Sequence, residues 1–354
     1  FNPQSLLTTK AAPLTADRLG QLWVGSNKGL TRIAADGTRF RHFNILNSPL
    51  RANDINPLFV SPSGRLYVST WTAGFCVGEP GAERFTPVTL PGRSKSVKSF
   101  AAADSGRVWV ATQERDLFLY DEKTTRLHPV DLTPVTRAST LFSFNVLLYD
   151  RQGTLWIGTY NTGLLAWNHR TNRVHLFTAD GRTGSLGSSS IVSLYEDRIG
   201  RVWVGTNGGG LHRFDSATSR FQPITTRNGL ANNYIAGIQE DAQGTLWLST
   251  NGGISSYNPA TGDIHNYDQR DGLVGKEFLQ NASAALPDGR LAFGSTQGLV
   301  VFHPDRLKET MPPPRVYLTG LKLFNRPVSP TDRNAPTRLS LTDAPSLVFR
   351  PDQS

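Results

Sequence analysis

Flat aromatic rings, amides and cations recur in one kind of position along this 354-residue sequence, namely the turn or connection beside a short apolar strand. Such a set suits an oligosaccharide or a carboxylate ligand, because rings stack on sugar faces, amides bind hydroxyls and Arg binds acidic groups. The candidate binding residues are Trp71, Arg93, Lys95, Arg115, Arg137, Tyr160, Asn161, Asn207, Asn232, Tyr234 and Asn251, and the same face would hold Lys28, Asn53 and Asp54.

Backbone geometry is an alternative explanation for the asparagines in this set. Asn tolerates the left-handed conformation that hairpin turns demand, so these residues need not touch a ligand. Trp71 and Tyr160 are different, since a bulky ring gains nothing from such a turn. These two residues therefore favour a binding role.

The segment PGRSKSVKSF (residues 91–100) places Arg93, Lys95 and Lys98 in one connection. Arg115 and Arg137 are expected on neighbouring repeats, so the group forms either a solvated surface or an anion site. The net charge of +9 is spread along the chain. No recognition helix or basic motif interleaved with aromatics is present, and we therefore expect no nucleic-acid partner.

The element that positions these residues is a phrase of the type G-x-L-W-V-G-T, which occurs seven times. Its aromatic anchor residues are 42 to 47 positions apart: Trp23, Tyr67, Trp109, Trp156, Trp203, Trp247 and Phe293. A period near 45 is typical of a β-propeller, in which each repeat is a small sheet that must stack on its neighbours. We therefore predict an all-β fold, a seven-bladed β-propeller of four-stranded blades with almost no helix.

Acidic residues mark the turn before most anchor strands. Asp17, Asp150, Asp197 and Asp241 each precede a Gly by three residues, as in a type I turn. Ser61 replaces Asp in the second repeat, and the third turn is one residue shorter, at Asp104 to Gly106. Because these residues recur and lack the spacing of a calcium loop, we interpret them as turn residues. The anchors are interpreted as wedges between sheets.

Catalytic and redox chemistry find little support in the sequence. The histidines are dispersed and fit neither an HExxH pattern nor a nucleophile motif: His42, His128, His169, His175, His212, His265 and His303. The single cysteine, Cys76, is interpreted as a buried structural thiol. We predict no catalytic residue, no metal and no cofactor. A propeller lyase that uses His or Tyr on one face stays an alternative.

The repeats resemble the two-component regulator propeller, the periplasmic sensing unit of hybrid histidine kinases and related diguanylate cyclases. The resemblance covers about residues 14 to 310 and rests on the Asp turn, the L-W-I-G-T strand, the Asn/Gly turn and the inter-blade phrases RNGLANNYI and RDGLVGKEF. GLVGKEFLQNAS (272–283) resembles the family's last blade. MPPPRVYLTGLKLFNRPV (311–328) resembles the entry to the triple-tyrosine β-sandwich, so we expect a propeller over 1–310 and an incomplete sandwich over 311–354.

The resemblance implies an extracytoplasmic, periplasmic sensor of a two-component-type receptor. It would bind an oligosaccharide or anionic metabolite and relay the event through the sandwich to a membrane-linked output domain. It also implies a homodimeric receptor that meets the membrane only through downstream segments. The alternatives are a scaffold for a protein partner and, third, a polysaccharide lyase. To close the ring, we expect a segment within Phe1–Leu7 or the PPRVYLTG stretch to pair as the outer strand of the last blade.

Overall fold

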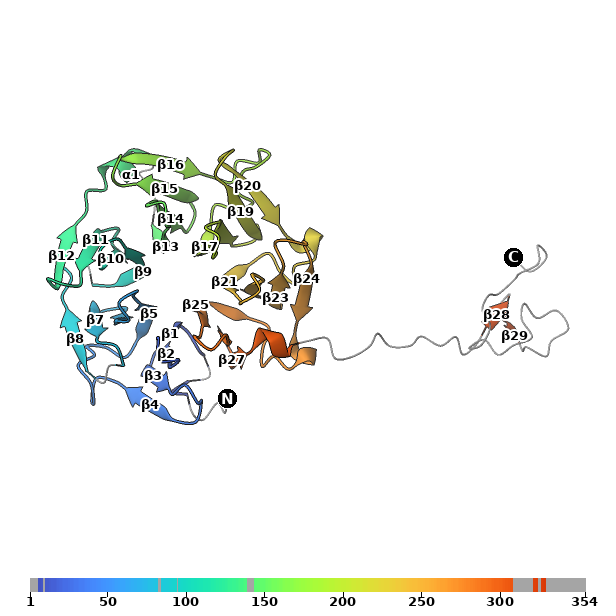
Figure 1. Ribbon diagram of the computed structural model, residues 1–354, viewed down its shortest axis with the longest axis horizontal. Helices are drawn as coiled ribbons and strands as arrows, with labels where there is room; N and C mark the ends of the chain where they lie inside the picture. Colours follow the sequence, from blue (N-terminus) through green and yellow to red (C-terminus); the bar gives the residue numbers. More distant parts are fainter. Residues whose placement is uncertain are drawn as a thin grey trace. The chain divides into compact units, whose positions relative to one another are not determined.

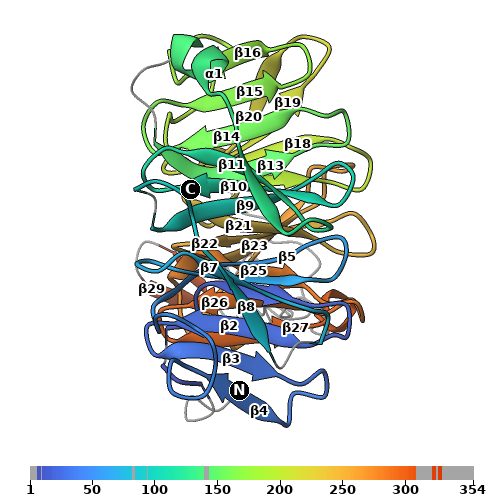
Figure 2. The same cartoon turned by 90° about the vertical axis from the view of Figure 1, so that its left-hand side faces the viewer.

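The computed structural model describes residues 6–8, 10–81, 84–93, 95–138, 143–307, 321–323 and 326–328. The chain divides into two compact parts, Phe1–Arg306 and Leu307–Ser354. The first part is a ring of β-sheets (Figure 1), seen from its edge in Figure 2. The predicted all-β propeller is thereby confirmed. None of the described helices is long and apolar enough to cross a membrane.

Each repeat begins with a strand beside the centre of the ring and proceeds outward (Figure 1). The inner strands are β1 (Leu14–Ala16), β5 (Ile55–Val60), β9 (Val97–Ala103), β13 (Phe144–Tyr149), β17 (Ile191–Glu196), β21 (Ile235–Glu240) and β25 (Phe278–Ala285). The second strands, which carry the anchors, are β2 (Leu22–Ser26), β6 (Leu66–Thr70), β10 (Arg107–Thr112), β14 (Leu155–Thr159), β18 (Val202–Thr206), β22 (Leu246–Thr250) and β26 (Leu291–Ser295).

The outer part of each repeat consists of a third strand and, in the first six repeats, a described rim strand. The third strands are β3 (Gly29–Ile33), β7 (Phe75–Gly78), β11 (Leu117–Asp121), β15 (Leu164–Asn168), β19 (Leu211–Asp215), β23 (Gly253–Tyr257) and β27 (Gly298–Phe302). The rim strands are β4 (Phe40–Phe43), β8 (Phe85–Val88), β12 (Arg126–Pro129), β16 (Arg173–Phe177), β20 (Arg220–Ile224) and β24 (Ile264–Tyr267). The described helical segments are α1 (Thr133–Ala138) and the short 3-10 turns Thr226–Asn228, Gln269–Asp271 and Pro304–Arg306.

The predicted count of seven separate four-stranded blades is wrong. Five sheets have four strands, whereas the first and last repeats share one curled sheet of seven strands, in the order β27-β26-β25-β1-β2-β3-β4. The join is a parallel pairing of Leu14 in β1 with Ala282 in β25. It is supported by a hydrogen bond of 3.2 Å from the amide of Ala11 to the carbonyl of Ser295. The inner strands of the first and last repeats are therefore neighbours in one sheet.

Gly294 makes this close approach possible. A Cβ at this position would lie 1.7 Å from the carbonyl oxygen of Ala11, so only glycine fits beside the incoming chain. Leu6 is buried in the same hydrophobic cluster as Leu14, Ala282 and Leu299. The chain start and the last repeat thus share one core. Apart from Leu6 and Leu7, both predicted closing segments lie outside the described residues.

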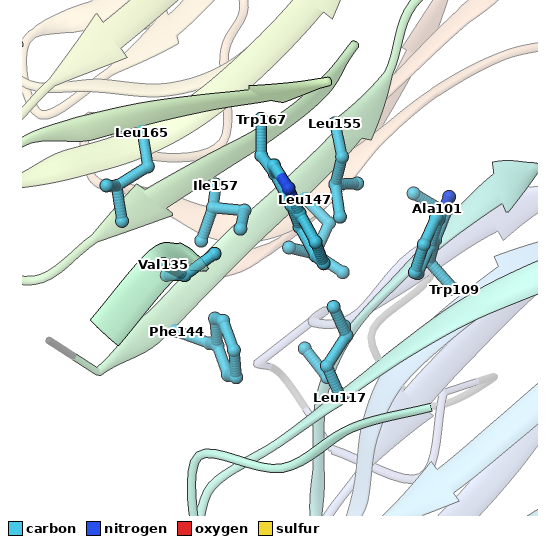
Figure 3. Close-up of a cluster of buried hydrophobic side chains, with 11 residues drawn as sticks. Ala101, Trp109, Leu117, Val135, Phe144, Leu147, Leu155, Ile157, Leu165 and Trp167 are labelled. Atoms are coloured by element: carbon cyan, nitrogen blue, oxygen red, sulfur yellow. The ribbon is translucent and has the colours of Figure 1, made fainter. Parts of the chain in front are cut away.

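The seven anchors are confirmed as wedges, since each is at most 4% exposed. Figure 3 shows one such junction, where Trp109 from β10 and Trp167 from β15 lie in a cluster built from two neighbouring sheets, with Val135 of α1 at its edge. Sheets stack here through side chains from the facing surfaces. Six junctions contain an aromatic anchor, whereas the cluster between the last and first repeats contains Ala292, because Phe293 lies one residue later and packs with Phe302 beside Trp247.

The turn aspartates have a second role that we did not predict from the sequence, which is to bind the indole of the anchor Trp. One carboxylate oxygen of Asp17, Asp150, Asp197 and Asp241 binds turn amides, and the other accepts a hydrogen bond of 2.7–2.8 Å from the indole Nε1 of the anchor six residues later. The four carboxyl groups are buried. Each Asp thus ties a turn to the Trp wedge of its own repeat.

Three repeats depart from the Asp turn: repeat 7 has Leu286 at the Asp position, and repeats 2 and 3 form other hydrogen bonds. Repeat 2 has Ser61 and Tyr67, and the Tyr67 hydroxyl donates a 2.8 Å hydrogen bond to Glu122 from the next sheet. In repeat 3, Asp104 accepts from Tyr149 instead, and the indole nitrogen of Trp109 has no hydrogen-bond partner among the described residues. Repeat 2 thus lacks both Asp and Trp, whereas repeat 3 keeps both residue types without the hydrogen bond between them.

The second compact part contains a described antiparallel hairpin, β28 (Leu321–Leu323) with β29 (Arg326–Val328). These strands fall in the segment for which we predict the start of a sandwich. The rest of that segment lies outside the described residues.

Candidate functional site

Two exposed aromatic residues are positioned by the same local motif. Trp71 and Tyr160 each follow a buried threonine at the end of a second strand. The hydroxyls of Thr70 and Thr159 each accept a hydrogen bond from the backbone amide three residues on, at 3.1 and 3.0 Å. The amide of Trp71 also donates to the carbonyl of Asp54 at 3.2 Å. These turns hold the two rings on the predicted face of the propeller.

Lys98 lies between these two rings. Its Nζ is 5.4 Å from the centroid of Trp71 and 4.7 Å from that of Tyr160, and it donates a hydrogen bond to the Tyr160 hydroxyl. Lys98 is only 6% exposed, whereas Trp71 and Tyr160 are 43% and 41% exposed. Repeats 2, 3 and 4 thus contribute one residue each to a cluster, which we call the lysine–aromatic cluster.

Tyr234 belongs to the same region. Burial raises the pKa of Tyr234, and a smaller contribution comes from the nearby Tyr160 hydroxyl. Tyr234 is therefore a neutral hydroxyl at pH 7. A backbone bridge joins it to Asn207, and the side chain of Asn232 accepts a 2.8 Å hydrogen bond from its amide. Asn232 thus serves backbone geometry.

A cavity of about 540 Å³ opens beside the cluster, and we call it the mouth cavity. Its lining includes Asp54, Asn56, Trp71, Tyr234 and Gln280. The Oδ1 atom of Asp54 is buried and has no hydrogen-bond partner among the described residues. Trp71 contributes to both the cluster and the cavity, so a ligand in the cavity would meet a ring, hydroxyl and amide groups, a carboxylate and the amine of Lys10.

A bulge in β25 contributes Leu279 and Gln280 to the lining of the mouth cavity. Pairing with β26 passes from Phe278 with Ser295 directly to Ser283 with Phe293, so the residues between protrude. Gln280 crosses to the inner strands of two other sheets, where its Nε2 donates to the Asn145 side chain at 3.1 Å and to the Val192 carbonyl at 2.9 Å. A second cavity of about 600 Å³, lined by all seven inner strands, lies along the channel.

The remaining predicted site residues do not join the cluster in the described part of the chain. Arg93, Lys95 and Arg115 are exposed, and Arg137 is exposed on α1. Asn161, Asn207 and Asn251 are exposed in the turns where we expect them. The structure therefore brings Trp71 and Tyr160 together with Lys98 and places Tyr234 near them.

The sequence reading placed Lys98 in a connecting loop with Arg93 and Lys95, and that placement is wrong. Lys98 is the second residue of inner strand β9, at the position that Asn56, Asn145 and Leu279 occupy in their own inner strands. Asn56 and Leu279 line the mouth cavity. Aligning the inner strands of the repeats would have identified this position.

Comparison with known proteins identifies the repeats. Residues 142–161, 185–208 and 229–252 match the family model described as the two-component regulator propeller. These three segments therefore have the sequence pattern of two-component regulator propeller repeats. A histidine kinase of Formosa agariphila is 36% identical over 76 residues, which make up 22% of this chain and 6% of that relative.

Solved structures with the same fold include two kinds of protein. The extracellular domain of a hybrid two-component system from B. thetaiotaomicron has a TM-score of 0.78 at 23% identity, covering 94% of this chain and 45% of that one. Virginiamycin B lyase from Staphylococcus aureus has a TM-score of 0.64 at 12% identity, covering 83% and 94%. The chain therefore shares its fold with the extracellular domain of a two-component system and with a lyase, and it spans less than half of that two-component chain.

Proposed function

We propose that this chain is the extracytoplasmic, periplasmic ligand-sensing region of a two-component-type receptor, and that the mouth cavity binds a small ligand such as an oligosaccharide or an anionic metabolite. The observation that carries the proposal is the lysine–aromatic cluster. Trp71 and Tyr160 keep large exposed faces although they hold a buried cation. Exposed rings beside a cavity with polar groups are the usual make-up of a small-molecule site.

Signalling from this site requires two arrangements of the receptor that differ in ligand affinity. The ligand would shift how two receptor copies associate, and the segment after the propeller would pass the change to a membrane-linked output domain. The regulator propeller repeats and the likeness to a two-component extracellular domain support this assignment. The output chemistry would reside outside the chain described here.

A thermal-shift screen against neutral and acidic oligosaccharides tests the proposal. A ligand that binds only the folded state at 100 times its Kd adds about 2.7 kcal/mol of stability and raises the melting temperature. Mass spectrometry of the recovered ligand then separates a sensor from a lyase, since a sensor returns the ligand unchanged. New unsaturated ends would assign the chain to the lyases. If no small molecule raised the melting temperature, the protein-scaffold alternative would replace this proposal.

A further inference from the structure

We propose that Lys98 binds a carboxylate and that the ligand class is an acidic saccharide, a sugar ring carrying a uronic-acid group. This inference rests on the proposed function and specifies the chemistry of the same site. It assigns the ionic contact to a buried residue of β9 rather than to the exposed Arg93, Lys95 and Arg115.

Lys98 is a buried cation without a counter-charge among the described residues. An ammonium group loses much of its hydration when buried, and this loss is offset only by an ion pair or good hydrogen bonds. Lys98 is 6% exposed and forms no salt bridge within the described residues. Its ammonium group donates a hydrogen bond to the Tyr160 hydroxyl and lies 5.4 Å from the centroid of the Trp71 ring. The charge is therefore held in place without an anion, and a ligand carboxylate would supply one.

The exposed ring of Trp71 offers a stacking surface beside this cation. Trp71 faces Lys98 and also lines the mouth cavity, while more than two fifths of its surface is open. The apolar face of a sugar ring can stack on such a surface while a substituent reaches the cation beside it. Stacking and charge pairing are then available to one ligand at the same time.

Asp54 narrows the choice of ligand. Asp54 lines the mouth cavity and its Oδ1 has no hydrogen-bond partner among the described residues, so its carboxylate would accept a hydrogen bond from a sugar hydroxyl. Recognition of phosphate favours the Arg fork, which this cluster does not contain. These points favour a monoanionic, hydroxyl-rich ligand.

Titration calorimetry with trigalacturonate and its methyl ester tests the inference. The two probes share their rings and hydroxyls and differ in charge. We expect the unaltered chain to bind the acid at least tenfold more tightly than the ester, with a preference that shrinks as salt screens the charges. Lys98→Met should bind both probes with the affinity that the unaltered chain has for the ester. Lys95→Met removes an exposed lysine three residues away and should behave like the unaltered chain.

The outcomes separate this inference from the proposed function. Binding of neutral oligosaccharides with no preference for the acid would overturn the carboxylate assignment and leave the sensor proposal standing. An acid preference that survives in Lys98→Met would also overturn it, and Lys98→Gln gives a second test if the first variant does not fold. Displacement of the acid by equimolar inorganic phosphate would contradict the choice of carboxylate. If neither probe nor any neutral oligosaccharide bound, both proposals would fail.

Discussion

Removing the carboxylate of Asp150 should destabilise the ring more than its position in a surface turn suggests. This side chain is 3% exposed. It accepts hydrogen bonds from the amides of Gln152 and Thr154, at 3.0 and 2.8 Å, and from Trp156 Nε1 at 2.7 Å. Asp150→Ala leaves all three donors without an acceptor. The buried indole N–H costs about 2–3 kcal/mol and the two turn amides, which water reaches, about 1 kcal/mol each, so we expect a loss of about 4–5 kcal/mol.

Urea unfolding followed by circular dichroism measures this loss as a shift in the midpoint at constant slope. Asp104→Ala is the matched control, because Asp104 occupies the same turn in repeat 3 but is half-exposed and receives no bond from its anchor. We expect it to cost about 1 kcal/mol. In a Trp156→Phe background, Asp150→Ala should cost about 2 kcal/mol less than in the unaltered chain. Equal costs in both backgrounds would refute the Asp–Trp coupling.

Three further predictions concern buried residues. The buried His212 accepts a 2.8 Å hydrogen bond from the amide of Gly187, and burial lowers its pKa from 6.5 to about 4. Since the unfolded chain binds the proton first, stability is complete above pH 6.5 and falls by about 3 kcal/mol toward pH 4. Unfolding at pH 7 and pH 5 should show about 2 kcal/mol of this loss, reduced in His212→Gln and unchanged in the exposed control His128→Gln. Trp203→Ala removes a fully buried wedge and should cost about 3–5 kcal/mol in the same urea assay, and unchanged stability would refute the wedge role. Burial raises the pKa of the Cys76 thiol to about 11, so native protein at pH 8 should resist iodoacetamide until urea unfolds it.

The repeat architecture could be predicted because one physical requirement recurs along the chain. Each sheet needs a large wedge against its neighbour, so residues such as Trp156 and Trp203 repeat at a fixed spacing and are visible in the sequence. The join at the chain ends could not be predicted in this way. It depends on a parallel contact between β1 and β25 and on the missing side chain of Gly294, which are features of single positions.

The candidate site was predicted in part for the same reason. Trp71 and Tyr160 stand out because their turns normally hold small or flexible residues. Lys98 was assigned to a loop because its neighbours Arg93 and Lys95 are basic, and the strand boundary at Val97 separates them. Charge alone could not show that one of three nearby cations is buried while the other two face solvent.

The proposed function requires that the mouth cavity bind a ligand without changing it. Calorimetric titration with the saccharide that gives the largest thermal shift tests this directly. The variants Trp71→Ala and Tyr160→Ala are compared with Ile199→Ala, which alters an exposed apolar residue in a turn before a second strand. We predict that each aromatic variant weakens binding by about 1–3 kcal/mol through lost stacking area, that Ile199→Ala has no effect, and that the saccharide is recovered intact. Equal affinity in all three variants, or a cleaved saccharide, would contradict the account.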